Sequence, residues 1–434
     1  MVPRYPKITP PLLPMPRAVR WHKADIQLPS PFILKVSSED LMVLGGIIQG
    51  FIQKVEEQVG ISVDIDTSEV PYEGFHCQIT TNATRFRHEQ AYRLEISEQA
   101  ILLESKSKIG AAYALQTLLQ IFLFSGRTVP TCYITDHPDV KIRGVHLDLF
   151  DGGIPQQHTM EELITLMSAL KLNKLELFCV DEVSQTQISD LQIFFWQKFA
   201  QERMVEMSWH RASRTNTQDT ETCYVHPKRS AFTGIQPTIQ DLSILNQEYS
   251  GYSLQFQEVT EKAPTFLFMT YSLLAWSSKL WCQETNKDQD GHAWLDEIYF
   301  HERSGSAASL CHGLIHACPN HQEDLQHWVE ERFFGPNLSR SNRPLTENEL
   351  IAWKQWRDNV IREVAQLEYL EFQRVGGKWF LNELQHTCQW LLIALDDVTN
   401  PNPDHHKIEK ALRTYRDYRN RRYVAKTTAL FRSK

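Results

Sequence analysis

The stretch RGVHLDLFDGG, residues 143–153, places an arginine at the mouth of an apolar run and polar side chains along and beyond it. Apolar and polar residues alternate here with a period near two, which predicts a β-strand. A strand that only filled a core would not need the charged or titratable side chains that this one carries, which are Arg143, His146, Asp148 and Asp151. The stretch therefore predicts a buried strand that also carries functional groups.

The elements around this strand predict a βαβ unit. Pro138 breaks the chain just before it. After it, residues 158–172 (HTMEELITLMSALKL) have helical periodicity, with Thr159 and Glu162 spaced as a capping box. Residues 175–180 (LELFCV) predict a second strand. Connections this short between strand, helix and strand favour parallel pairing of the two strands.

The preceding part of the chain predicts a compact α/β domain. Residues 41–59 have apolar side chains at helical spacing, and residues 91–105 (AYRLEISEQAILLES) alternate on both sides of a turn, as in a hairpin. Residues 109–124 (IGAAYALQTLLQIFLF) are apolar on most sides of a helix, which predicts that this helix is buried.

The later part of the chain is patterned less evenly. A helix is expected from about Ser189, followed by a strand over residues 205–210 (VEMSWH). Residues 212–265 are polar and weakly patterned, and residues 265–276 (TFLFMTYSLLAW) fit either a strand or a buried helix. From about residue 346 onward the chain is expected to be helical.

The overall composition is that of a folded, water-soluble protein. The 434 residues are 42% hydrophobic and 23% charged, with a formal net charge of −8. This charge disfavours nucleic acid and membrane surfaces as partners. The sequence has no apolar stretch of signal-peptide or membrane-spanning length, and its eight cysteines form no paired framework. We therefore expect a cytoplasmic protein, and the oligomeric state is left open.

Motifs follow one another along the first half of the chain: the hairpin 91–105, the helix GAAYALQTLLQ (110–120), the connector ITDHP (134–138), RGVHLD (143–148) and LKLNKLEL (170–177). In this order they resemble glycoside hydrolase family 20, the β-N-acetylhexosaminidases. The resemblance is close from about residue 30 to residue 182 and becomes loose beyond.

This resemblance implies a fold of the α/β class. It implies an N-terminal, non-catalytic, zincin-like α/β domain over residues 1–138 and a (β/α)8-type barrel over residues 139–340. A C-terminal helical region would follow over residues 341–434. The barrel region has roughly 200 residues, near the lower limit for eight βα units, so we expect an abbreviated or incomplete barrel.

The resemblance also implies substrate-assisted, retaining hydrolysis of terminal N-acetylglucosamine or N-acetylgalactosamine. The 2-acetamido oxygen of the sugar would attack the anomeric carbon, so the enzyme would supply no nucleophile. The best candidates for the acid pair of the family are Asp181, which would orient the acetamido group, and Glu182, which would protonate the leaving oxygen. The expected partner is an amino-sugar glycoconjugate or oligosaccharide.

Further residues match the substrate-binding positions of the family. Arg143 stands where family members bind sugar hydroxyls, and Trp209 would correspond to a tryptophan of the pocket. Tyr271, Trp281 and Glu284 are weaker candidates for contacts with the sugar. Each of these residues also has a structural alternative: Arg143 in an ion pair with Asp148 or Asp181, and the aromatic side chains in core packing.

One departure from the family leaves the activity open. In the family the acid pair lies on the fourth barrel strand, whereas Asp181 and Glu182 follow the second predicted strand. A catalytically degenerate relative that acts as a binding or scaffolding module is therefore the alternative to an active hydrolase. A truncated gene product that folds poorly is a third possibility.

Two other segments have unusual compositions, but neither predicts a cofactor site. Residues 311–321 (CHGLIHACPNH) hold cysteines and histidines, but their spacing is not that of a standard zinc site, so no metal is expected. The basic, aromatic segment around YRDYRNRR, residues 415–422, resembles a C-terminal helix that packs against the barrel in longer relatives. We expect no cofactor for the chain.

Overall fold

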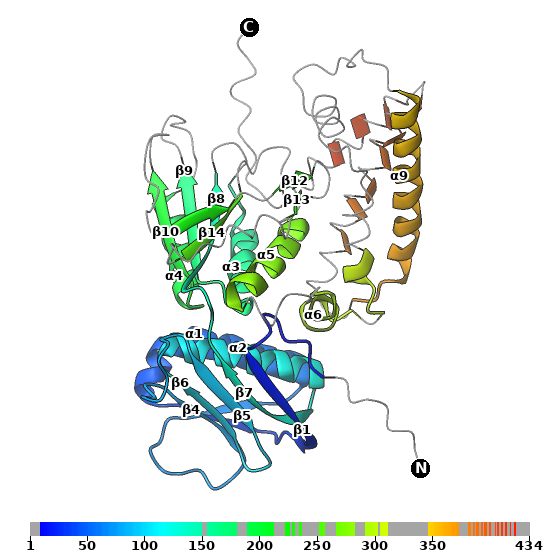
Figure 1. Ribbon diagram of the computed structural model, residues 1–434. Helices are drawn as coiled ribbons and strands as arrows, with labels where there is room; N and C mark the ends of the chain where they lie inside the picture. The colour runs from blue at the N-terminus through cyan, green and yellow to red at the C-terminus, as the bar shows by residue number, and fades with distance from the viewer. Residues whose placement is uncertain are drawn as a thin grey trace, which may run out of the picture.

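The computed structural model describes most of the chain. The described residues are 9–149, 154–179, 189–211, 222–225, 228–230, 234–236, 251–256, 266–282, 291–302, 304–310, 346–372 and, with interruptions, 381–421. They form two larger sheets with helices packed between and around them (Figure 1). The expected α/β class is confirmed.

The first sheet has seven strands in the order β1-β7-β5-β6-β4-β2-β3. Their bounds are β1 Ala18–Gln27, β2 Phe32–Lys35, β3 Val63–Asp66, β4 His76–Thr80, β5 Tyr92–Ile96, β6 Ile101–Ser105 and β7 Thr128–Asp136. The predicted hairpin is confirmed: β5 and β6 pair antiparallel, with Ile96 opposite Ile101. In both strands every second side chain is buried, because one face of the sheet meets the core.

Two helices cover this sheet. Helix α1 (Ser38–Lys54) continues into a π-helical turn, η1 (Val55–Val59), and helix α2 spans Lys108–Ser125. Helix α2 has buried residues on every side, as its sequence predicted, because it lies between the first sheet and the helices of the second (Figure 1). On its far side, Gln116 donates to the Ser168 hydroxyl at 3.3 Å and Gln120 donates to the carbonyl of Ala169 at 3.4 Å.

The second sheet is parallel and has the order β10-β9-β8-β14-β11. Its strands are β8 Ile142–Asp148, β9 Lys174–Cys179, β10 Glu206–Arg211, β11 Thr222–Val225 and β14 Gly251–Phe256. The predicted βαβ unit is present, with α3 (Gln157–Ala169) joining β8 to β9. Strand β14 pairs with the other edge of β8, so β8 has a neighbouring strand on each side. The sequence of β14 carries no strand signal.

The two faces of the parallel sheet differ in chemistry. Val145, Leu147, Leu175 and Leu177 are fully buried on one face. Because side chains alternate along a strand, His146 and Glu176 belong to the opposite face, where they are register partners. His146 of the opening stretch therefore shares a face with a carboxylate of the next strand.

The remaining described elements are mostly helical. They are α4 (Asp190–Gln201), α5 (Phe266–Trp281), α6 (His292–Trp294), the π-helical turn η3 (Leu295–Phe300), α9 (Glu347–Gln366) and the short turn η4 (Leu367–Tyr369), together with the two-stranded β12 (Lys228–Ser230) and β13 (Gly234–Gln236). The ambiguous segment 265–276 falls in helix α5. The helix expected from about Ser189 is confirmed as α4, whose N-cap is Ser189: its side chain accepts from the backbone N–H of Gln192.

One expected detail is wrong. The capping box of Thr159 and Glu162 does not form, because α3 begins at Gln157 and its N-cap is Gln156, without a side-chain cap. Thr159 is instead a buried residue within the first turn.

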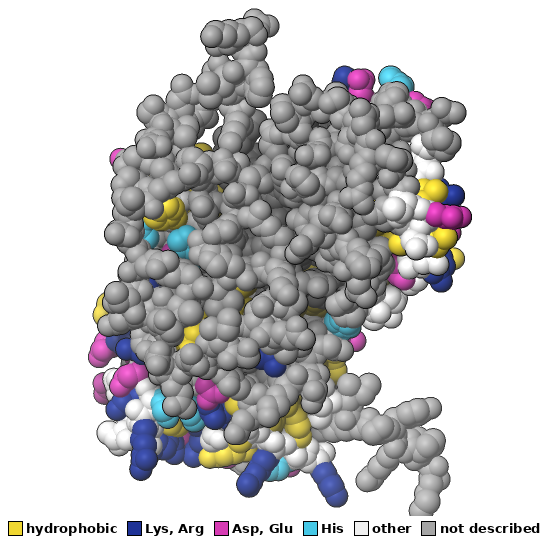
Figure 2. Space-filling model, turned by 45° about the horizontal axis from the view of Figure 1, so that its top comes forward, with side chains coloured by type: hydrophobic (Ala, Val, Ile, Leu, Met, Phe, Trp, Pro, Cys, Tyr) yellow, Lys and Arg dark blue, Asp and Glu magenta, His cyan; other side chains and the backbone are white. Residues whose placement is uncertain are grey.

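The described part of the sheet has five parallel strands, so an eight-stranded barrel stays a prediction. Among the described helices none is long and apolar enough to cross a membrane. At the bottom of Figure 2, over the first sheet, basic and acidic side chains are interspersed on the visible surface. The cytoplasmic location stays a prediction.

Candidate active site

A polar cluster lies on the face of the parallel sheet that carries His146. Glu176 from β9 stands at its centre, and its side chain is 2% exposed. The Ser253 hydroxyl of β14 donates to Glu176 Oε2 at 3.1 Å, and Lys174 Nζ lies 3.1 Å from Oε1. His146 Nδ1 lies 4.0 Å from Oε2. A buried carboxylate is stable only with such donors and charges around it, so these side chains form one unit.

The glycine of the opening stretch makes this cluster possible. A Cβ at Gly144 would lie 2.4 Å from Ser253 Oγ, so only glycine leaves room for the serine that donates to Glu176. The carbonyl of Gly144 in turn accepts from Trp276 Nε1 of α5 at 3.0 Å. The RG dipeptide therefore has a packing role at its second residue.

The proposed acid pair follows the strand that carries Glu176. Strand β9 ends at Cys179, and Asp181 and Glu182 follow after Val180. Both lie outside the described residues, as do Asp151 and Glu284. Ligands of parallel α/β sheets bind outside the carboxyl ends of the strands. Asp148, the last residue of β8, marks the same edge on the neighbouring strand.

Arg143 occupies a different place from the one expected of a sugar ligand. It lies near the amino end of β8, is 0% exposed, and all its side-chain nitrogens donate to protein groups. Nε and Nη2 donate to the Lys171 carbonyl at 3.0 and 2.7 Å, Nη2 also to the Tyr113 hydroxyl at 2.8 Å, and Nη1 to Gln90 Oε1 at 2.8 Å. No N–H of this guanidinium is left for a ligand, so Arg143 does not take the expected role of binding sugar hydroxyls. The alternative partners, the side chain of Asp148 and Asp181, lie outside the described residues.

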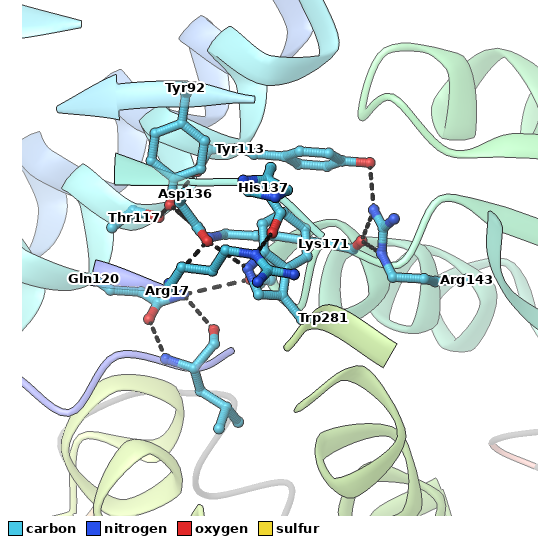
Figure 3. A network of polar contacts seen from close by, with 12 residues as sticks. Arg17, Tyr92, Tyr113, Thr117, Gln120, Asp136, His137, Arg143, Lys171 and Trp281 are labelled. Atoms are coloured by element: carbon cyan, nitrogen blue, oxygen red, sulfur yellow. Dashed lines mark hydrogen bonds and ion pairs between the residues drawn. The ribbon is translucent and has the colours of Figure 1, made fainter. Parts of the chain in front are cut away.

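Trp281 belongs to the same buried junction between the two sheets (Figure 3). Its indole is 0% exposed and donates from Nε1 to Asp136 Oδ1 at 2.9 Å. The Arg143 guanidinium lies 4.9 Å from its ring centroid and Lys171 Nζ 4.3 Å. The tryptophan thus packs Arg143 of β8 and Lys171 of the α3–β9 connection against the end of β7, which is a structural role rather than a wall of a sugar pocket.

A buried ion pair completes the junction. Lys171 Nζ lies 3.3 Å from Asp136 Oδ2, which also accepts from the Tyr92 hydroxyl at 2.7 Å (Figure 3). Burial lowers the pKa of Lys171 to about 8, although Asp136 acts in the opposite direction. Burial and the neighbouring Asp136 carboxylate raise the pKa of Tyr92 well above its usual value. The two sheets are therefore joined by charges that water does not reach.

The other expected site residues are distributed over the sheet and helix α5. Trp209 of β10 is the register partner of Leu177, so it lies on the apolar face, opposite Glu176, and packs against the core. Tyr271 lies within α5. Among the described residues no group of three or more metal-binding side chains occurs, and residues 311–321 lie outside them.

Glu176 is the residue that sequence reasoning missed. Its signal was present in LELFCV, where a glutamate separates two leucines of a buried strand. A charge at such a position has to face a polar surrounding, so the alternation alone pointed to a second polar face beside His146.

Comparisons with known proteins find similarity mainly in the part of the chain that forms the first sheet and its helices. Residues 9–137 match the family described as "Glycosyl hydrolase family 20, domain 2". Beta-hexosaminidase B of Pseudoalteromonas piscicida is 31% identical over 91 residues, which are 21% of this chain and 12% of that protein. The chain therefore matches only about an eighth of that relative's length.

Solved structures resemble the chain over different extents. The structure of CpGH84D shares 10% identity with a TM-score of 0.52, covering 94% of this chain and 93% of its own. A β-N-acetylhexosaminidase from Bacteroides fragilis NCTC 9343 shares 19% identity over 46% of this chain and 44% of its own, with a TM-score of 0.37. At this identity the likeness to CpGH84D concerns the fold alone.

Proposed function

We propose that the chain is a glycoside hydrolase that removes terminal N-acetylhexosamine, because residues 9–137 match domain 2 of glycosyl hydrolase family 20. The family 20 domain is the observation that carries this proposal. The polar face formed by His146, Glu176 and Ser253 supports it, because Asp181 and Glu182 come after the carboxyl end of the strand that carries Glu176.

In the proposed reaction the substrate supplies its own nucleophile. The acetamido oxygen forms a bond to the anomeric carbon while the bond to the leaving oxygen breaks, and Glu182 donates its proton to that oxygen. Asp181 accepts from the acetamido N–H and stabilises the charge of the oxazolinium. Water then forms a bond to the anomeric carbon as the bond to the acetamido oxygen breaks and the acetamide is restored; the Glu182 carboxylate takes the proton of the water, and the configuration is retained.

The buried cluster would position this machinery rather than react. Glu176 is three residues before the end of β9; its ion pair with Lys174 of the same strand and its hydrogen bond from Ser253 of β14 hold it in place. The acid pair starts two residues after the strand ends, so a fixed strand limits the positions it can take.

A second candidate function is a catalytically degenerate relative that binds glycans without cleaving them. Arg143 and Trp281 are expected in the sugar pocket, but both are buried in the junction between the sheets and donate their hydrogen bonds to protein groups there. The acid pair also follows β9, the neighbour of the first parallel strand, rather than a fourth strand. If the chain does not hydrolyse a hexosaminide substrate, these features favour a glycan-binding module.

One assay separates the two functions. Hydrolysis of a chromogenic N-acetylglucosaminide is measured for the full chain, for Glu182→Gln and for Glu98→Gln, an exposed glutamate in the β5–β6 turn. Loss of a general acid costs about 10²–10⁴-fold in rate. We expect a loss of that size for Glu182→Gln only. Equal rates in the two variants would refute the assignment of Glu182, and absence of turnover in the unmodified chain with retained binding of a thiazoline inhibitor would establish the binding module.

A further inference from the structure

A cavity of about 520 Å³ lies along helices α2 and α3. Residues from α1, α2, α3, α4 and η3 line it, so both sheets contribute helices to its wall. Helix α2 contacts the amino end of β8 through Tyr113 and Arg143, whereas the proposed acid pair follows the carboxyl end of β9. The cavity is therefore separate from the proposed active site, and its size is that of a small-molecule site.

The cavity combines aromatic and aliphatic surface. Leu119 and Leu123 of α2 and Phe199 of α4 line it together with Tyr299. The Tyr299 ring stacks on the buried indole of Trp294, with ring centroids 5.7 Å apart and an interplanar angle of 17°. This support holds the tyrosine ring in place, and a fixed ring face is suited to the apolar face of a pyranose.

The polar groups of the cavity are of both signs. Glu161 and Glu162 of α3 provide acceptors, and Lys54 and Arg203 provide donors. The Arg203 guanidinium lies 3.3 Å from the ring centroid of Phe199, so it is held against the aromatic wall. Two carboxylates and two cations give the lining no strong preference for a charged ligand, whereas hydroxyl groups both donate and accept.

One buried donor in the wall lacks an acceptor. Trp294 is 2% exposed and lines the cavity, and its Nε1 has no hydrogen-bond partner among the residues that the structure describes. Because this nitrogen is itself buried, the indole contributes to the wall through its ring rather than through a hydrogen bond to a ligand.

We propose that this cavity binds a neutral saccharide of one or two sugar units, apart from the active site. The ring of Tyr299 takes the apolar face of a sugar, and Glu161 accepts from its hydroxyls. The choice of a saccharide rests on the proposed glycosidase function, and the cavity would hold a second part of the glycan on which the enzyme acts.

Binding of thiochitobiose, an S-linked disaccharide of N-acetylglucosamine that resists hydrolysis, tests the proposal by titration calorimetry on the full chain. The variants are Tyr299→Ala and Glu161→Gln, with Tyr369→Ala and Glu297→Gln as exposed controls of the same residue types. We expect two binding sites in the unmodified chain. Each cavity variant should weaken one site at least tenfold and leave hydrolysis of the chromogenic substrate within twofold, and the controls should change neither.

The outcomes separate this proposal from the proposed function. Disaccharide binding that depends on Tyr299 and Glu161 supports the cavity site even where no hydrolysis is found. Unchanged affinities in both cavity variants, with or without hydrolysis, overturn it. Glu161→Gln keeps the proposal testable if Tyr299→Ala fails to fold, because this change retains the shape of a partly exposed side chain on α3.

Discussion

The buried pair of Asp136 and Lys171 is expected to stabilise the junction between the two sheets, and Asp136→Asn tests this. The two side chains are 0% and 1% exposed and lie 3.3 Å apart. Asparagine keeps the shape of the side chain but leaves the ammonium group without a counter-charge. Removing one partner of a buried pair costs about 3–5 kcal/mol, a large part of the stability of a typical domain.

The carboxylate also holds three other donors, which increases the expected loss. Asp136 Oδ1 accepts from Trp281 Nε1 at 2.9 Å and from the backbone N–H of Arg17 at 3.1 Å, and Oδ2 accepts from the Tyr92 hydroxyl at 2.7 Å. The amide of asparagine has a single acceptor oxygen, so at least one of these buried donors loses its partner.

Urea denaturation followed by circular dichroism measures the effect, with Lys171→Met and the double variant completing a cycle. We expect Asp136→Asn to lose about 3–5 kcal/mol, and the double variant to lose clearly less than the sum of the two single changes. Glu39→Gln is the control, because Glu39 pairs with Lys108 on the surface and its side chain is 74% exposed. Additive single effects, within about 0.5 kcal/mol, would refute the reasoning.

The pH dependence gives an independent check of the same pair. The pKa of Lys171 is about 8 in the folded chain and 10.5 as its ordinary value, so between these pH values the unfolded chain binds more protons. The free energy of unfolding should therefore gain a contribution from Lys171 as the pH rises from 8 toward 10, and this gain should be absent in Lys171→Met. A pH profile identical in both proteins would contradict the burial of a charged lysine.

Three further predictions concern packing and reactivity. Gly46→Ala should destabilise the chain by about 1–3 kcal/mol, because a Cβ there would lie 2.4 Å from the carbonyl oxygen of Glu202. A Cβ at Gly45 of the same helix would meet nothing within 4 Å, so Gly45→Ala should stabilise the chain by about 0.5–1 kcal/mol. The two variants should therefore shift the denaturation midpoint in opposite directions. Gly144→Ala should cost about 1–3 kcal/mol by displacing Ser253, and Ser253→Gly in the same chain should recover part of the loss in a thermal melt. Burial raises the pKa of the Cys77 thiol to about 12, so iodoacetamide at pH 8 should label it only after denaturation; labelling of the native chain would contradict its burial.

The local elements of the fold could largely be predicted from the sequence. The hairpin at residues 91–105, the buried helix 109–124 and the βαβ unit around Arg143 depend on apolar spacing that is readable over a few residues. The segment 212–265 could not be placed, because β14 gains its strand conformation by pairing with β8, more than 100 residues earlier in the chain.

The candidate site was less accessible to sequence reasoning. An arginine on a buried parallel strand has the same appearance in a sequence whether its guanidinium binds a sugar or a neighbouring carbonyl. The structure directs Arg143 to the Lys171 carbonyl and the Tyr113 hydroxyl, and it directs Trp209 to the apolar face. The roles of Asp181 and Glu182 stay a prediction for the kinetic assay.

The sequence by itself determined the α/β class, the order of the first elements and the resemblance to family 20, because these depend on periodicity and on short motifs. Only the tertiary structure decided which polar groups meet. Glu176 is joined with His146 and Ser253, and Asp136 with Lys171, because strands and helices from distant parts of the chain bring them within 4 Å. Once such groups are excluded from water, their partners fix their chemistry, and no local pattern in the sequence specifies those partners.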